Sequence, residues 1–147
     1  MEHKEIELND AKLRVWNDGT IERWLKGGWK KVKTSLVGYS VIRINKKLYY
    51  CHRITAMAFL DFDINSKLDI DHIDRNKQNN NVSNLRILTH QQNMFNQQVK
   101  GCSFSKYRWE SYIKINGKKK HLGWFKTEEE AHNTYLEAKN IYHTLPN

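Results

Sequence analysis

Apolar and polar residues alternate in short runs over the first fifty residues. A period of two residues is typical of strands, and it predicts them at 13–16, 21–25, 29–34, 39–44 and 47–50. Turn-forming residues separate several of these runs: Asn17-Asp18-Gly19, Gly27-Gly28 and Asn45-Lys46. The first ten residues are acidic and show no period, so we expect a frayed tail there. The first part of the chain is therefore predicted to be a meander of small antiparallel strands.

The period changes at residue 51, where Ile54, Met57 and Ala58 follow helical spacing and predict a helix over 51–60. A polar loop follows, and twelve of the twenty-three residues from Asn76 to Gln98 are Asn or Gln. Within this polar stretch, 84–89 is predicted to be a short strand and 91–99 the start of a helix. The order is strand, polar loop, strand and helix.

The last part of the chain has its own pattern. Alternating runs at 109–115 and 118–125 are joined by Asn116-Gly117, a strong hairpin signal. Thr127 and Glu130 form a capping box that opens a helix to about residue 142. With a short run near 101–105, this predicts three strands and one helix. The whole chain is thus predicted to be α+β.

Charge is distributed unevenly along the 147 residues, whose formal net charge is +9. Residues 11–60 carry a net +9, 61–100 carry zero, and 101–147 carry +3. A basic balance of this kind favours a polyanionic partner, and the neutral middle segment lies between two basic segments. The tryptophans of the first sheet, interleaved with lysines and arginines, are either a nucleic-acid surface or the core of the sheet. Both interpretations stay open, because a sheet has two faces.

The middle segment holds side chains that suit phosphodiester hydrolysis. Asp71 and Asn93 offer oxygen ligands for a hard cation such as Mg²⁺, and His72 can serve as a general base near neutral pH. Asn84 offers an amide to hold the histidine. We interpret these four side chains as the active-site residues of a nuclease.

Two sequence motifs contain three of these residues: Asp71-His72-Ile73-Asp74 and Ser83-Asn84-Leu85-Arg86. They resemble the motifs of the HNH endonucleases of bacteriophages and mobile introns. Asn84 is twelve positions after His72, and Asn93 is nine positions after Asn84. This spacing resembles that of the HNH motif variant whose last residue is Asn. The resemblance implies a ββα-metal nuclease unit. In it, His72 would activate water, Asp71 and Asn93 would hold one Mg²⁺ (or Mn²⁺), and Asn84 would orient the His72 ring.

The resemblance extends upstream to about residue 39. It implies that Arg53 lies near the active site and contacts a phosphate, and Arg75 is a second candidate DNA contact. His52 is expected to be a packed or hydrogen-bonded structural residue. His90 is expected to be solvated or capping, although its addition to the ligands would make Zn²⁺ or Ni²⁺ credible.

The C-terminal part resembles the Apetala-type DNA-binding domain in Trp109 to Ile115, His121-Leu122-Gly123-Trp124-Phe125 and Thr127 to Ala131. That family reads DNA with its sheet, which implies DNA contacts from outward-facing side chains. The candidates are Arg108, Tyr112, Lys114, Lys119 and His121, with the acidic Glu110 among them. Lysines dominate this face where the plant domains carry arginines, so modest sequence specificity is expected.

The hydropathy of the chain and its two cysteines bear on its location and on zinc binding. The chain has no apolar run of membrane length and no cleavable signal pattern, so we expect a cytoplasmic protein, in the host cell if it is phage-encoded. The two cysteines, Cys51 and Cys102, are far apart and lack zinc-site spacing. We expect them to be small buried side chains.

We therefore predict an HNH endonuclease that hydrolyses double-stranded DNA. Its segments would be a small β region at 1–38, the nuclease at 39–100 and the Apetala-type domain at 101–147. One active site per chain would nick one strand, acting as a monomer or a transient dimer. Two alternatives remain: a DNA-binding protein on an inactive HNH scaffold, and a nuclease for RNA or single strands.

Overall fold

The computed structural model describes residues 1–95 and 100–143 of the chain. It confirms the α+β class, with antiparallel sheets and few helices. The chain forms two compact units, Met1–Leu88 and Thr89–Asn147. The predicted three-part division by function, at residues 38 and 100, stays a prediction.

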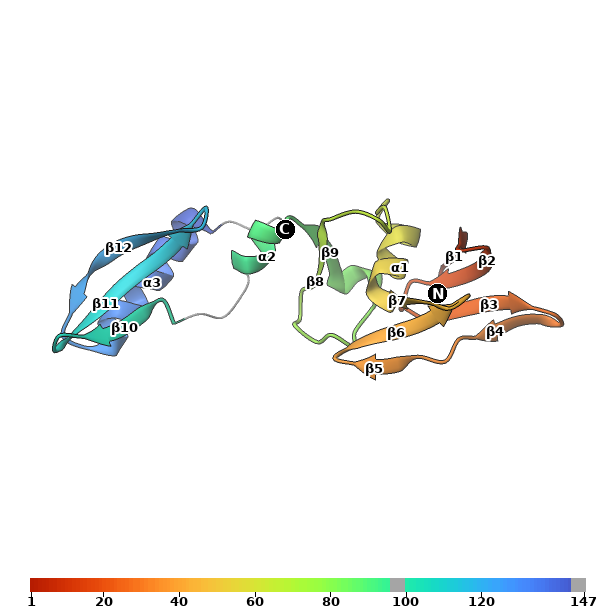
Figure 1. The fold of residues 1–147 in the computed structure, drawn as a ribbon, viewed down its shortest axis with the longest axis horizontal. Helices are drawn as coiled ribbons and strands as arrows, with labels where there is room; N and C mark the ends of the chain where they lie inside the picture. The colour runs from red at the N-terminus through yellow and green to blue at the C-terminus, as the bar shows by residue number, and fades with distance from the viewer. Residues whose placement is uncertain (96–99, 144–147) are drawn as a thin grey trace. The chain divides into compact units, whose positions relative to one another are not determined.

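The first unit begins with a four-stranded antiparallel sheet (Figure 1). Its strands are β1 (His3–Leu8), β2 (Ala11–Trp16), β3 (Ile21–Leu25) and β4 (Gly28–Lys31). The frayed tail expected at residues 1–10 was therefore wrong. Asn9 and Asp10 both adopt positive φ, 50° and 60°, and so form a tight hairpin turn. This turn lets β1 pair with β2 along its whole length, and Leu8 is buried in the core.

A second, three-stranded sheet follows, built from β5 (Ser35–Val37), β6 (Tyr39–Ile44) and β7 (Lys47–Tyr50). Helix α1 (Cys51–Phe59) comes directly after β7, close to the predicted range. Ile42, Ile44 and Ile54 share one core with Leu13 and Val15 of the first sheet. The N-terminal sheet therefore packs as part of the first unit.

The predicted strand–loop–strand segment is present. Strand β8 (Asp69–His72) pairs antiparallel with β9 (Leu85–Leu88), and a 3₁₀ turn, η1 (Val82–Asn84), precedes β9. This hairpin packs on α1 through Ile70, Leu85 and Ala56. Helix α2 (His90–Phe95) follows β9 in the chain and belongs to the second unit. The end of the helix predicted at 91–99 lies partly outside the described residues.

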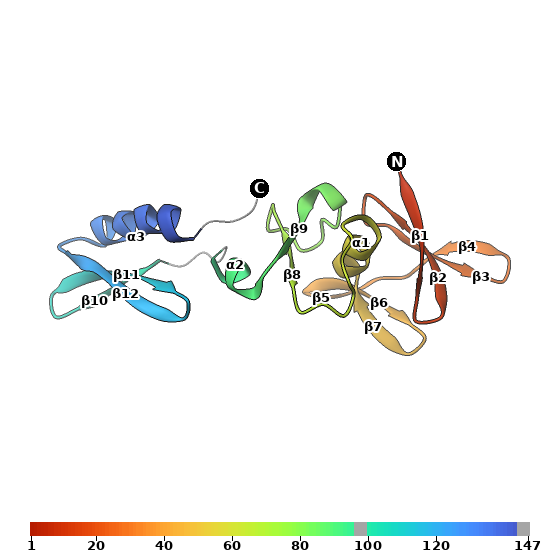
Figure 2. The ribbon, with the colours of Figure 1, turned by 90° about the horizontal axis from the view of Figure 1, so that it is seen from above.

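The part of the second unit after residue 100 has the three strands and one helix predicted for it: β10 (Cys102–Ser105), β11 (Arg108–Ile115), β12 (Lys118–Phe125) and α3 (Glu128–Tyr142). Thr127 caps α3, its side chain accepting from the Glu130 backbone N–H. Figure 2 shows α3 lying along one face of this sheet, where Ile113, Tyr135 and Ala138 form the core.

The structure also bears on the two cysteines and on membrane-spanning helices. Cys51 and Cys102 are both buried free thiols, as predicted. Burial raises the pKa of the Cys51 thiol to about 11, which leaves it protonated and unreactive near neutral pH. No helix in the described part of the chain is long and apolar enough to cross a membrane.

Candidate active site

His72 stands at the end of strand β8, and only 4% of the residue is exposed. Its Nε2 lies 2.8 Å from Oδ1 of Asn80, which is also buried. An amide oxygen can only accept, so with the amide oriented as in the structure Nε2 carries the proton. The lone pair is then on Nδ1, the atom that could take a proton from water.

Asn80 is held by the N-terminal sheet. The turn between β2 and β3 accepts a backbone hydrogen bond from Val82 N at Asn17 O, 2.9 Å away. Gly19 of the same turn has φ +92°, and a Cβ placed there would lie 2.6 Å from the Asn80 Cβ. The turn therefore presses directly against the residue that orients His72. Only glycine permits this close approach without a shift of the Asn80 backbone.

Asn84 has a different role from the one expected. Its amide accepts from Asp74 N (3.0 Å) and donates to Asp74 Oδ1 (2.9 Å) and to the Asn79 carbonyl (2.8 Å). The expected hydrogen bond from Asn84 to the His72 ring is thus corrected: Asn80 holds the ring, and Asn84 closes the loop that carries Asn80. Both amides lie in an Asn-rich stretch, and spacing alone could not separate their roles.

The amide-rich loop is a series of local turns. Side-chain oxygens of Asp74, Asn76, Asn79 and Asn81 each accept from the backbone N–H two residues further on. Such turns satisfy backbone groups where no strand or helix does. Hydrogen bonds, that of Asn79 first, hold the pKa of the Asp74 carboxyl below its usual value. The loop is therefore fixed by its own sequence as well as by Asn84.

The same loop is tied to the second sheet. Gln78 accepts from the Ser40 hydroxyl at 2.7 Å and donates to the Gly38 carbonyl at 3.0 Å. Lys77 places its Nζ 4.8 Å from the centre of the Tyr39 ring. These contacts fix the start of β6 beside the loop that surrounds His72.

Two aromatic rings contact that of His72, and a third packs behind them. The ring of His52 lies 5.1 Å from that of His72 and Tyr39 lies 6.0 Å from it, while Tyr50 contacts both Tyr39 and His52. Burial, then the charges of His72 and Arg53, lowers the pKa of His52 to about 4. His52 is therefore neutral near pH 7. The expectation of a packed residue is met, and no hydrogen bond of its ring is seen in the described residues.

Asp71 precedes His72 in β8, so the two side chains leave opposite faces of the hairpin. Asp71 Oδ2 accepts from Arg86 Nε at 2.8 Å, across the strand pair. The Asp71 carboxylate and the Asn93 amide are oxygen donors, and this chemistry fits a hard divalent ion. The described residues hold no group of three His, Cys, Asp or Glu side chains that could bind a metal.

Asn93 and His90 lie on α2, in the second unit. Thr89 begins this helix, with its hydroxyl accepting from Gln92 N and its own N–H donating to Gln92 Oε1. The Asn93 backbone N–H completes the first turn by donating to the Thr89 carbonyl. His90 is exposed at the first helical position.

Arg53 and Arg75, the two arginines predicted to bind DNA in this segment, differ in their surroundings. The Arg53 guanidinium donates to the carbonyls of Ile64, Ser66 and Leu68 and lies over the Phe62 ring. It therefore holds the 61–68 loop, and its contact with a phosphate stays a prediction. Arg75 is exposed, with φ 62°, in the turn after β8.

The five candidate DNA contacts of the second unit lie on or beside one face of its sheet. Ser111 and Ile113 point to α3, so the alternate residues Tyr112 and Lys114 face the other way. Lys119 and His121 pair with them across β12, and Arg108 is exposed at the start of β11. Glu110 binds both Lys119, at 3.2 Å, and His121, at 3.0 Å. One carboxylate thus neutralises part of this basic face.

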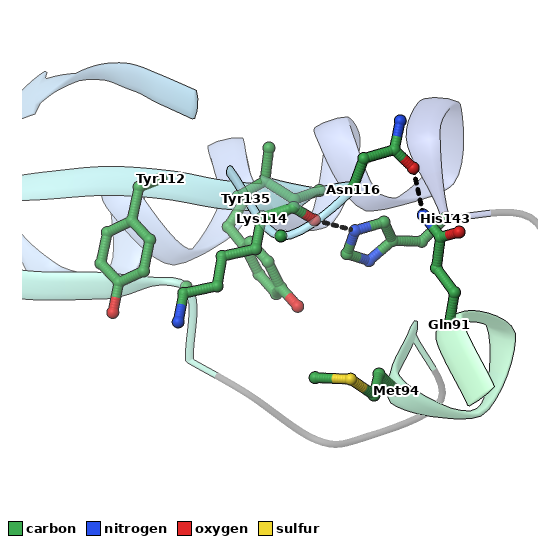
Figure 3. A pocket seen from close by; sticks show the side chains of 10 residues that line it. Gln91, Met94, Tyr112, Lys114, Asn116, Tyr135 and His143 are labelled. Carbon is green, nitrogen blue, oxygen red and sulfur yellow. Dashed lines mark hydrogen bonds between the residues drawn. The ribbon is translucent and has the colours of Figure 1, made fainter. Parts of the chain in front are cut away.

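The second unit also contains a cavity, shown in Figure 3. Gln91 and Met94 of α2, Tyr112 and Lys114 of β11, and Tyr135 and His143 are among its lining residues. His143 Nε2 bonds to the Lys114 carbonyl, and Gln91 bonds to Asn116. None of the four predicted catalytic residues lines this cavity.

The middle segment of the chain matches known proteins. Residues 49–95 match the family model described as HNH endonuclease. The chain is 36% identical over 97 residues to an uncharacterized HNH endonuclease, L560, of Acanthamoeba polyphaga mimivirus, covering 62% of this chain and 52% of the relative. It is 32% identical over 105 residues to the DNA endonuclease I-HmuI of Bacillus phage SP01, covering 69% and 60%.

A solved structure agrees with these matches. It is described as DNA binding and cleavage by the HNH homing endonuclease I-HmuI, and it matches with a TM-score of 0.55 at 32% identity. The match covers 66% of this chain and 57% of that one. The chain thus spans less than two thirds of the length of these relatives. Residues 49–95 therefore match the HNH endonuclease family model, and the chain has homologues among the HNH homing endonucleases.

Proposed function

We propose that this protein is a metal-dependent endonuclease that hydrolyses phosphodiester bonds of double-stranded DNA. The observation that carries the proposal is the pair His72–Asn80, within the HNH endonuclease segment: a buried imidazole whose Nε2 is held at 2.8 Å by an amide oxygen. A general base needs a fixed ring and a defined tautomer, and Asn80 supplies both.

His72 acts on the attacking side of the phosphate. Its Nδ1 removes a proton from water, the hydroxide attacks phosphorus as the bond to the 3′ oxygen breaks, and the departing 3′ oxygen takes a proton from solvent. The products are a 5′-phosphate and a 3′-hydroxyl. Asp71 leaves the opposite face of β8, and we assign it the separate role of a metal ligand. Asn84 keeps the loop closed while the ring becomes charged.

Asp71 and Asn93 are the residues that would hold a divalent ion, and we propose Mg²⁺, with Mn²⁺ as a substitute. HNH nucleases generally depend on divalent metals, and a small set of oxygen ligands completed by phosphate and water is typical of Mg²⁺. When bound, such an ion neutralises charge on the phosphate and on the departing 3′ oxygen. Arg86 then has to share or release the Asp71 carboxylate it now pairs with.

The second unit supplies DNA affinity in this proposal, through an Apetala-type module. Arg108, Lys114, Lys119 and His121 provide positive charge for phosphates, and Tyr112 an aromatic surface. One active site per chain nicks one strand, so a monomer would leave open-circle plasmid and a transient dimer would give linear DNA. The homologues belong to a phage and a virus, and we propose that this protein too acts on DNA in the cytoplasm of an infected cell.

Cleavage of supercoiled plasmid, with and without Mg²⁺, tests the proposal. Replacing His72 by Ala should slow cleavage by at least about 100-fold, the usual contribution of a general base, while duplex binding in EDTA is unchanged. His3→Ala, on the exposed end of β1, serves as the control. Native protein that binds duplex DNA yet does not cut it in either Mg²⁺ or Mn²⁺ would instead indicate a DNA-binding protein on an inactive scaffold. Preference for single-stranded competitor would indicate the other substrate class.

A further inference from the structure

His52 is a second histidine at the candidate active site. It is the second residue of α1 and is 7% exposed, close to the 4% of His72. The two rings meet nearly edge to face, with centroids 5.1 Å apart and planes at 67°. Tyr39 and Tyr50 cover the other sides of His52, at 5.0 and 5.4 Å. His52 is thus buried to a similar degree as the proposed base and shares its contact with Tyr39.

The two nitrogens of the His52 ring differ in their surroundings. Nδ1 is fully buried and has no partner among the described residues, whereas Nε2 is not fully buried and makes no hydrogen bond within them. Leaving a buried donor or acceptor unsatisfied costs about 1–3 kcal/mol, and apolar side chains would fill the same space without that cost. Buried polar groups of this kind are rare and require an explanation. A role for the ring in binding substrate through its accessible Nε2 is one such explanation.

The chemical state of the ring follows from its surroundings. Burial keeps His52 neutral, so one nitrogen carries a proton and the other a lone pair. An orphaned buried N–H is rarer than an under-satisfied acceptor, so the enclosed Nδ1 is best assigned the lone pair. The proton is then on Nε2, which makes His52 a hydrogen-bond donor without a formal charge.

We propose that His52 is a further catalytic residue, whose Nε2–H donates a hydrogen bond to a non-bridging oxygen of the phosphate that His72 attacks through water. The inference rests on the proposed nuclease function. Charge builds on these oxygens as hydroxide attacks, so a fixed donor stabilises the transition state more than the bound substrate. A neutral donor adds this hydrogen bond without placing a second positive charge beside His72 as that ring accepts its proton.

The competing explanation is packing alone, in which His52 only fills space between Tyr39 and His72. Two pairs of variants separate the explanations. His52→Phe keeps a ring and removes both nitrogens, whereas His52→Gln loses the ring and keeps a donor. His52→Met has nearly the shape of Gln without a donor, so Gln and Met differ mainly in the hydrogen bond. His3→Phe, a histidine that contacts Trp16, is the matched control.

The experiment measures single-turnover cleavage of a duplex at saturating protein, duplex affinity in EDTA, and thermal unfolding. We expect His52→Phe and His52→Met to cut about 10- to 100-fold more slowly than native protein, at unchanged affinity. His52→Gln should recover about tenfold over Met, and His3→Phe should cut normally. Equal rates for Gln and Met, or a Phe variant as fast as native protein, would overturn the role of His52.

Failure of the proposed function gives a different result. If native protein does not cut, or His72→Ala cuts as well as native protein, the nuclease proposal fails, and the role of His52 fails with it. If native protein cuts and needs His72 while the His52 variants cut normally, only the role of His52 fails. Should His52→Phe unfold, the Gln and Met pair still decides the question, because a packing role predicts no difference between those two.

Discussion

The loop around His72 and the basic face of the second unit use polar side chains in opposite ways. Near His72 the side chains of Asn80 and Asn84 are buried, and Asn84 alone makes three side-chain hydrogen bonds. On the β11–β12 face, Arg108 and Lys114 are exposed, and Lys119 and His121 both contact one carboxylate, that of Glu110. The first arrangement fixes geometry, whereas the second mainly supplies charge.

This difference follows from what each region is proposed to do. Proton transfer requires a ring held within a fraction of an ångström, so the supporting shell must be rigid before substrate binds. Phosphate binding needs positive charge within reach of a polyanion, and flexible exposed lysines satisfy that need. Substitutions near His72 should therefore change cleavage rate or stability, while substitutions on the basic face should change affinity and its salt dependence.

The largest effect should come from Asn80, with Asn84 as the contrasting residue. Asn80→Ala removes the hydrogen bond to His72 and should slow single-turnover cleavage by about 10- to 100-fold, with unchanged duplex affinity. Asn84→Ala breaks the loop closure and should lower the free energy of unfolding by about 1–3 kcal/mol in urea titrations. A stable Asn84→Ala protein that has lost cleavage, beside a fully active Asn80→Ala protein, would restore the role first predicted for Asn84.

A smaller effect should come from the turn that presses on Asn80. Gly19 and Gly27 both have positive φ, +92° and +100°, but only Gly19 approaches another residue; a Cβ at Gly27 meets nothing within 4 Å. Gly19→Ala should shift Asn80 and slow cleavage roughly tenfold. Gly27→Ala should cost only about 1 kcal/mol of stability from its backbone conformation. Single-turnover rates and urea unfolding of the two variants check this, and equal cleavage rates would mean that the turn does not position Asn80.

The smallest effect concerns Glu110 on the basic face. Glu110→Gln releases Lys119 and His121 from their shared carboxylate, so duplex affinity should rise about threefold and fall more steeply with salt. Glu137→Gln, an exposed position on α3, changes net charge equally and should have a smaller effect. Fluorescence anisotropy at two salt concentrations measures both. Equal shifts for the two variants would show that only net charge matters, and that Glu110 does not control this face.

Much of the secondary structure could be predicted because its signals are local. The alternation at 21–25 and 39–44, the Asn116-Gly117 turn and the Thr127 cap each depend on residues adjacent in the chain. The residues 3–8 were misjudged because their pairing depends on a turn of Asn9 and Asp10 that lacks glycine. The prediction of Asp71, His72, Asn84 and Asn93 as site residues rests on sequence motifs and their spacing, which are also local information.

What the sequence by itself determined is therefore the α+β class, the order of the elements and the segment that resembles the HNH endonucleases. Only the tertiary structure decided which amide reaches His72, because Asn79, Asn80, Asn81 and Asn84 are chemically alike and differ only in where the loop directs them. It also decided that Gly19, Tyr39 and His52, distant in the chain, meet near the same ring. Such contacts depend on the packing of separate strands and helices, and no local pattern of residues encodes them.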